Sequence, residues 1–155
     1  IDGYSTAGNA MAGKYLGENN KEKLKLLVIK LLKINILVAV GLGIIYTALY
    51  PFLGAWFNDS PAVVTVFNSF LWLVIIAQPF NSIAFKMVGI FKGMGKAKLL
   101  RNTLIIGSFL IFIPTLIITD SFGWEVMSIW IAFIAWMAFR GFSLTYWFFK
   151  KEIIK

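Results

Sequence analysis

The sequence predicts an all-α fold, a polytopic bundle of transmembrane helices. Of its 155 residues, 59% are hydrophobic and only 14% are charged, and the mean hydropathy is +0.81. Soluble domains are about 45–50% apolar and about 25% charged, so this chain has too few polar residues to cover a soluble surface. Strict alternation of apolar and polar residues is missing, which argues against a transmembrane barrel.

Long stretches without charge predict where the helices cross the bilayer. Uncharged runs of 25, 26 and 18 residues cover positions 34–58, 60–85 and 102–119. A fourth apolar stretch, 126–149, is interrupted only by Arg140. Because a bilayer core requires about 20 apolar residues in a helix, four complete spans are expected. We predict them at residues 34–57, 61–91, 102–119 and 126–149.

The segment before the first complete span has two parts. Residues 1–17 are rich in Gly and Ala, carry one acidic charge at Asp2, and are too short to cross a bilayer, so we expect the end of a truncated span. Residues 18–33 alternate Lys with Leu and Val. This basic cytoplasmic segment is expected either to lie in the headgroup plane as an amphipathic helix or to extend the following span as a basic first section.

Basic residues are concentrated in alternate connections. Lys and Arg fill the segments 14–33, 92–101 and 150–155, whereas the connections near Asp59 and Asp120 contain neither. The positive-inside rule places the basic connections and the C-terminus in the cytoplasm of a multi-pass protein of the cell membrane. Because this distribution accounts for the net charge of +8, the expected partner is a lipid bilayer, and no nucleic-acid partner is expected.

Catalytic and metal-binding chemistry is poorly supported by the composition. The chain has no Cys and no His, which removes thiol nucleophiles, imidazole acid–base groups and the usual zinc ligands. The Gly-rich segment 89–96 lacks the spacing of a phosphate-binding loop. Gly89 and Gly93, like Gly13 and Gly17, have instead the spacing that favours close helix packing. We expect no enzyme, no metal site and no cofactor.

The span 61–91 contains the most informative polar residues. Gln78, Asn81 and Phe85 follow helical spacings and form one stripe beside Pro79, which is expected to kink or break the helix. Such a stripe indicates either the lining of a solute pathway or hydrogen bonding between neighbouring helices.

Charged residues also occur within the apolar segments. Asp2 and Arg140 are expected at membrane depth, where each becomes a candidate for the pathway. Lys86 lies nearer the cytoplasmic end of its span and is expected to snorkel to the interface.

Several motifs resemble the multidrug and toxic compound extrusion (MATE) family of transporters. Asp2-Gly3 with residues 10–17 resembles the family's eighth helix. Residues 79–95, continuing to 100–102, look like its tenth helix and the following loop. Arg140-Gly141 is similar to the last helix of the DNA-damage-inducible subgroup.

The resemblance implies a fold of twelve helices in two bundles, of which this chain would be the C-terminal portion, with about four complete spans and part of a fifth. Residues 1–155 would form a partial C-terminal bundle whose partner is the missing N-terminal bundle. The implied function is an antiporter that exports organic, often cationic, compounds by alternating access, with sodium or a proton as coupling ion.

In this interpretation the pathway includes Asp2, Gln78, Asn81, Phe85 and Arg140. Val88 stands where family members often carry an acidic residue, so cation binding would depend on Asp2 or on carboxylates of the missing bundle. The alternatives are a flippase for lipid-linked sugars in the same superfamily and a small structural membrane protein.

Overall fold

The computed structural model describes the backbone of residues 2–153 and the side chains of residues 7–151. It confirms an all-α bundle, because no strand occurs within the described backbone. The elements in chain order are α1 (Asp2–Gly17), α2 (Lys21–Ala48), α3 (Tyr50–Phe57), α4 (Pro61–Gly93), α5 (Ala97–Ile106), the π-helical η1 (Gly107–Phe112), α6 (Ile113–Asp120), α7 (Val126–Trp147) and the π-helical η2 (Phe148–Ile153).

Four helical segments within the described residues are long and apolar enough to cross a membrane. Their outward faces expose large apolar side chains, among them Leu37, Phe109, Leu110 and Ile117. A water-exposed surface of this kind would be unfavourable, whereas lipid tails cover it at no cost. The chain is therefore a multi-pass membrane protein. The segments are Lys21–Ala48, Pro61–Gly93, Ala97–Asp120 and Val126–Lys151.

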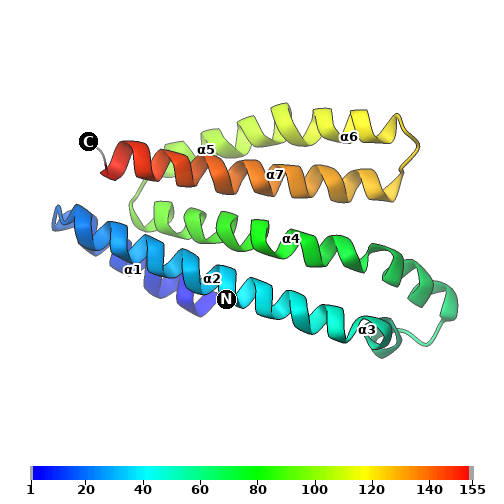
Figure 1. Cartoon of the computed structure of the whole chain (residues 1–155). Helices are drawn as coiled ribbons and strands as arrows, with labels where there is room; N and C mark the ends of the chain where they lie inside the picture. Colours follow the sequence, from blue (N-terminus) through cyan, green and yellow to red (C-terminus); the bar gives the residue numbers. More distant parts are fainter. Residues whose placement is uncertain (1, 154–155) are drawn as a thin grey trace.

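Helix α4 lies at the centre of the bundle (Figure 1). It packs on α1 and α2 on one side and on α7 on the other, and α7 in turn carries the α5–η1–α6 segment. A buried apolar cluster lies toward one end of the bundle and joins α2, α4, α7 and η2 through Leu24, Met87, Phe91, Leu144 and Phe148. The position of α4 makes its side chains the natural place to look for a site.

The structure differs from the single span expected at 34–57. Helix α2 ends after Ala48, and the short α3 follows from Tyr50, because Pro51 has no N–H with which to continue the α2 hydrogen bonds. Helix α3 then folds against α4, where the Tyr50 hydroxyl donates a hydrogen bond to the carbonyl of Asn68. The apolar run is therefore divided between a long helix and a short one.

The basic segment after α1 belongs to a long helix. Helix α2 begins at Lys21 and continues without a break to Ala48, which corresponds to the second of the two expected arrangements. The Asn20 side chain accepts a hydrogen bond of 3.0 Å from the Lys23 backbone N–H and caps the helix. The lysines therefore lie on the first turns of a membrane-spanning helix.

The segment expected as one helix at 102–119 runs from Ala97 to Asp120 and widens in its middle. The π-helical η1 lies just before Pro114. The proline ring displaces the carbonyl four residues earlier, and the wider turn of η1 accommodates this displacement. At the start of η1, Gly107 packs against α7, where an added Cβ would lie 2.9 Å from the Trp136 ring. The π-helical turn thus sits on the α7 contact.

Candidate functional site along helix α4

Helices α1 and α4 approach closely through glycines. A Cβ added at Gly89 would lie 2.6 Å from Oδ1 of Asn9, and one added at Gly13 would lie 2.7 Å from the carbonyl oxygen of Gly93. An added Cβ at Gly93 would collide with the backbone of Asn9. These contacts confirm the expected close packing at Gly13, Gly89 and Gly93, while Gly17 has no neighbour within 4 Å of its Cβ position.

Helices α4 and α7 also meet at a glycine. A Cβ on Gly141 would lie 3.1 Å from Cγ2 of Ile83. Both helices start at the end of the bundle that holds the turns near residues 58–60 and 121–125, so they run in the same direction (Figure 1). Arg140, next to Gly141, therefore lies at the depth of residues 82–83 of α4.

The stripe formed by Gln78, Asn81 and Phe85 lies on an incompletely covered face of α4. Phe85 is 51% exposed, whereas every residue from Lys86 to Phe91 is buried by α1, α2 and α7. Gln78 and Asn81 are half-buried. The stripe thus borders the open side of the central helix.

Asn81 and Arg140 lie on the same side of the α4–α7 contact. The rings of Phe80 and Phe142 meet edge-on, with centroids 6.4 Å apart. Successive residues of a helix are about 100° apart around its axis. Asn81, one residue after Phe80, and Arg140, two residues before Phe142, therefore both lie on the opposite side of the contact from the two rings. Two of the expected pathway residues therefore lie at a similar depth on one side of the α4–α7 contact.

Both polar residues have unsatisfied buried atoms. Oδ1 of Asn81 and Nε of Arg140 have no hydrogen-bond partner among the described residues, and the Arg140 guanidinium lies 5.5 Å from the centroid of the Trp136 ring. At membrane depth a bare polar atom is costly, so such atoms ordinarily find a partner in another helix, in water or in a ligand. The pair offers one acceptor and one donor.

Helix α4 continues through Pro79 without interruption, so no break forms there. Proline has no N–H, and the carbonyl of Ile75 therefore lacks its usual helical donor. The missing bond lies next to Gln78 and near the middle of α4, which weakens the helix at the level of the polar stripe.

Sequence reasoning misjudged Lys86. Its side chain is only 2% exposed, and its Nζ is buried without a hydrogen-bond partner in the described part of the chain. The expectation that it snorkels to the interface is wrong, because α1 packs tightly over this face of α4. A Lys one turn before a Gly-xxx-Gly pair was the signal in the sequence, since such a pair marks a buried face.

Asp2 is the first residue of α1, and its side chain lies outside the described part of the structure. Among the described residues, no cluster of three or more Asp, Glu, His or Cys side chains is placed to hold a metal ion.

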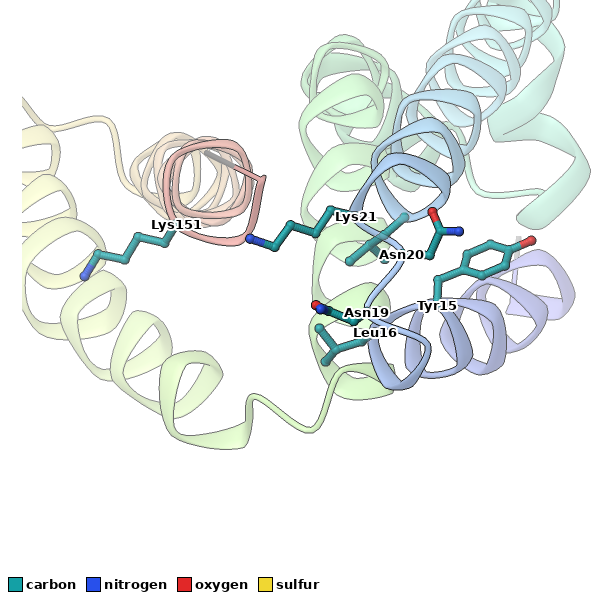
Figure 2. Close-up of a pocket in the computed structure, with 7 residues that line it drawn as sticks. Tyr15, Leu16, Asn19, Asn20, Lys21 and Lys151 are labelled. Carbon is teal, nitrogen blue, oxygen red and sulfur yellow. The ribbon is translucent and has the colours of Figure 1, made fainter. Parts of the chain in front are cut away.

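A separate small cavity lies at the basic end of the bundle. Its volume is about 100 Å³. Figure 2 shows Tyr15 and Leu16 from α1, the turn residues Asn19 and Asn20, Lys21 from α2, and Lys151 from η2 around it. None of the polar residues of the α4 stripe lines this cavity, so it is distinct from the candidate site.

Comparison with family models identifies the chain. The model of the family described as MatE matches residues 2–118, which include α1, α2, α4 and nearly all of the α5–η1–α6 segment. The chain belongs to the MatE family. Members of this family are membrane transporters and not enzymes. No curated protein and no solved structure matched the chain. The MatE match includes the whole Gln78–Phe85 stripe and stops before Arg140.

Proposed function

We propose that this MatE chain serves an ion-coupled antiporter that exports organic, mainly cationic, compounds across the cell membrane by alternating access. The observation that carries the proposal is that Asn81 and Arg140, near the exposed Phe85 of α4, have buried polar atoms without hydrogen-bond partners in the described structure. A transporter requires such atoms at membrane depth, because a solute leaving water needs replacement hydrogen bonds.

The chemistry of the stripe suits an organic cation. The exposed ring of Phe85 supplies an aromatic face that attracts a positive charge. Oδ1 of Asn81 is buried and has no hydrogen-bond partner among the described residues, so it can accept a hydrogen bond from a solute once the pathway opens. Pro79, with its missing backbone bond, gives α4 a place to bend as the pathway opens toward one side and then the other.

Asp2 is our candidate binding site for the coupling ion. A carboxylate at membrane depth binds sodium or a proton, and either ion neutralises a charge that the bilayer disfavours. Position 88, where related proteins often carry an acid, is Val in this chain and is buried. Sodium or proton binding at Asp2 would alternate with solute binding along α4.

We further propose that the basic end of the bundle faces the cytoplasm. Apart from Lys30, Lys33, Lys86 and Arg140, every described Lys and Arg lies at or near the end where α1 and α4 finish. The acidic residues Asp59, Asp120 and Glu125 lie at the other end. By the positive-inside rule, this distribution of charges supports a cytoplasmic C-terminus. The similarity of Arg140-Gly141 to the last helix of the DNA-damage-inducible subgroup supports the proposal that the chain belongs to that subgroup.

The test is gradient-driven efflux of a fluorescent organic cation from vesicles that contain the complete gene product. Wild-type protein is expected to export the cation when a sodium or proton gradient is imposed. Asp2→Asn should reduce this coupled export about tenfold or more while membrane insertion is unchanged. Asp59→Asn, at a loop, is the matched control and should export normally. Equal export by Asp2→Asn would remove Asp2 from the pathway, and transport of lipid-linked sugars without any gradient response would contradict the antiporter.

A further inference from the structure

A basic groove lies at the end of the bundle where α4 finishes and α5 begins. Residues 95–99, Asn102 and Trp147 line it, and its volume is about 570 Å³. Sites for small ligands commonly have volumes of about 300–1,000 Å³. The described lining residues include two lysines, Lys96 and Lys98, and no acidic residue. This Trp147 groove therefore has the size of a ligand site and the charge of an anion site.

The Trp147 ring brings two lysine ammonium groups together at the groove. Nζ of Lys96 lies 5.7 Å from the centroid of the ring, and Nζ of Lys151 lies 5.2 Å from it. Figure 2 shows the Lys151 side chain extending from η2 away from the α1–α2 turn. Each ammonium is attracted to the ring, but the two like charges repel each other. An anion between them would remove this repulsion.

Packing on the core of the bundle holds the Trp147 ring in place. The side chain is half-buried, and its ring meets the ring of Phe91 edge-on, with centroids 6.1 Å apart. Phe91 is fully buried in the apolar cluster described above. The two lysines therefore meet on an anchored ring, although Lys96 comes from the start of α5 and Lys151 from η2.

The groove lies at the level expected for the headgroups of the bilayer. One candidate span ends at Gly93, the next begins at Ala97, and the last ends at Lys151. The α4–α5 connection and the C-terminus lie at the same end of the bundle (Figure 1). Tryptophan is enriched at this level of membrane proteins, and basic pockets between membrane helices bind anionic headgroups there.

An apolar surface continues from the groove along α5. Ile105 and Ile106 follow Asn102 by three and four residues, so they lie on the same side of the helix. Both are exposed. A ligand with a charged head and apolar tails would therefore contact the groove with its head and α5 with its tails.

Phosphate oxygens suit the cations of the groove. Neither Lys98 nor Lys151 forms an ion pair with a described residue. Each ammonium has three N–H donors and no acceptor, and hydrogen bonds from such donors to a charged phosphate are stronger than those between neutral groups.

We propose that the Trp147 groove binds the headgroup of an anionic phospholipid, whose phosphate lies among Lys96, Lys98 and Lys151 while its acyl chains run along α5. This inference goes beyond the proposed function, because it requires membrane insertion and not antiport. In the orientation proposed above, the groove faces the cytoplasmic leaflet, whose surface is negatively charged.

Lipid titration of the complete gene product in a neutral detergent, followed by native mass spectrometry, tests the charge requirement. Phosphatidylglycerol should bind about tenfold more tightly than phosphatidylcholine with the same acyl chains. Lys96→Gln/Lys151→Gln should weaken phosphatidylglycerol binding about tenfold or more, whereas Lys96→Arg/Lys151→Arg should retain it.

The matched control is Lys23→Gln/Lys25→Gln, which removes two exposed lysines of α2 at the same end of the bundle. It should leave phosphatidylglycerol binding unchanged. Equal affinity for the two lipids, no loss in Lys96→Gln/Lys151→Gln, or the same loss in the control pair would overturn the site.

Lysine footprinting locates the lipid in the wild-type protein, without any substitution. Phosphatidylglycerol at ten times its dissociation constant should slow acetylation of Lys96, Lys98 and Lys151 by a water-soluble reagent about tenfold. Acetylation of Lys23 and Lys25 should continue at the lipid-free rate. Equal protection of all five lysines, or of none, would contradict binding in the groove.

A soluble headgroup distinguishes a lipid from a free phosphate compound. Glycerol 3-phosphate carries the phosphate without acyl chains, so at the same concentration it should protect the groove lysines far less than phosphatidylglycerol does. Equal protection by both would assign the groove to a soluble phosphate compound and overturn the lipid. None of these measurements requires gradient-driven export, so failure of the antiporter proposal and failure of the lipid site are seen separately.

Discussion

Gly141 of α7 packs directly on Ile83 of α4, where an added Cβ would lie 3.1 Å from Cγ2 of Ile83 and 3.3 Å from the backbone nitrogen of Ala84. Helix propensity favours Ala over Gly by about 1 kcal/mol, which offsets the small overlap of a single methyl. Gly141→Leu adds a branched side chain that this contact cannot accommodate. We expect Gly141→Ala to be nearly neutral and Gly141→Leu to destabilise the protein by about 1–3 kcal/mol.

Thermal unfolding in detergent, followed by tryptophan fluorescence, measures both variants. Ile129→Leu serves as a control at a 53% exposed position of the same helix, and its effect should be small. If Gly141→Leu melts with the wild type, α4 and α7 do not pack as closely as described.

Gly93 has no room for a side chain, because an added Cβ would collide with the carbonyl of Asn9 in α1. Backbone atoms of a packed helix cannot yield as a flexible side chain does. We expect Gly93→Ala to destabilise the α1–α4 contact by about 1–3 kcal/mol. Gly17→Ala, with no atom within 4 Å of its added Cβ, is the matched control and should not lower the melting temperature. Equal melting of the two variants would contradict this contact.

Replacement of Pro79 is expected to change stability and transport in opposite directions. Pro79→Ala restores the N–H that bonds to the Ile75 carbonyl and removes the ring from the helix interior, so stability is expected to rise by up to about 3 kcal/mol. The same change stiffens α4 beside Gln78 and should slow export by several-fold. Melting temperature and export rate, measured on one preparation, check both effects. A variant that is more stable and exports at the wild-type rate would show that bending at Pro79 is not needed.

The proposed orientation is checked by labelling single cysteines in intact cells with a membrane-impermeant maleimide. Ser60→Cys and Ser121→Cys lie at the acidic end of the bundle and should be labelled from outside. Lys98→Cys lies at the start of α5 and should be labelled only after the membrane is permeabilised. The reverse pattern would place the basic end outside and overturn the orientation.

The sequence was sufficient to predict the class of fold and the approximate spans. Charge-free stretches report directly on what a bilayer tolerates, and this requirement acts on each helix alone. The family also follows from residues in order along the chain, and the MatE match supports it. The gap between α2 and α3 was missed because Pro51 was counted within one long apolar run, although a proline ends the hydrogen bonding of the preceding helix.

The candidate site was less accessible to sequence reasoning. The helical spacing of Gln78, Asn81 and Phe85 placed them on one face, but which face remains open depends on how α1, α2 and α7 pack around α4. Lys86 shows the same limit. Its distance from the end of the helix suggested snorkelling, whereas glycine packing between α1 and α4 buries it. Burial of a single residue is decided by neighbours that are remote in the sequence.

The most direct test of the central claim, that the open side of α4 lines the solute pathway, is substrate protection of Phe85→Cys. The complete gene product, with other cysteines replaced, is treated with a small water-soluble thiol reagent with and without an organic cation that it exports. We expect Phe85→Cys to react, and the cation to slow the reaction at least about tenfold when it is saturating. Ile76→Cys, exposed on the same helix outside the stripe, should react slowly and show no protection. Equal reactivity at both positions, or the same rate with and without the cation at Phe85→Cys, would contradict the account.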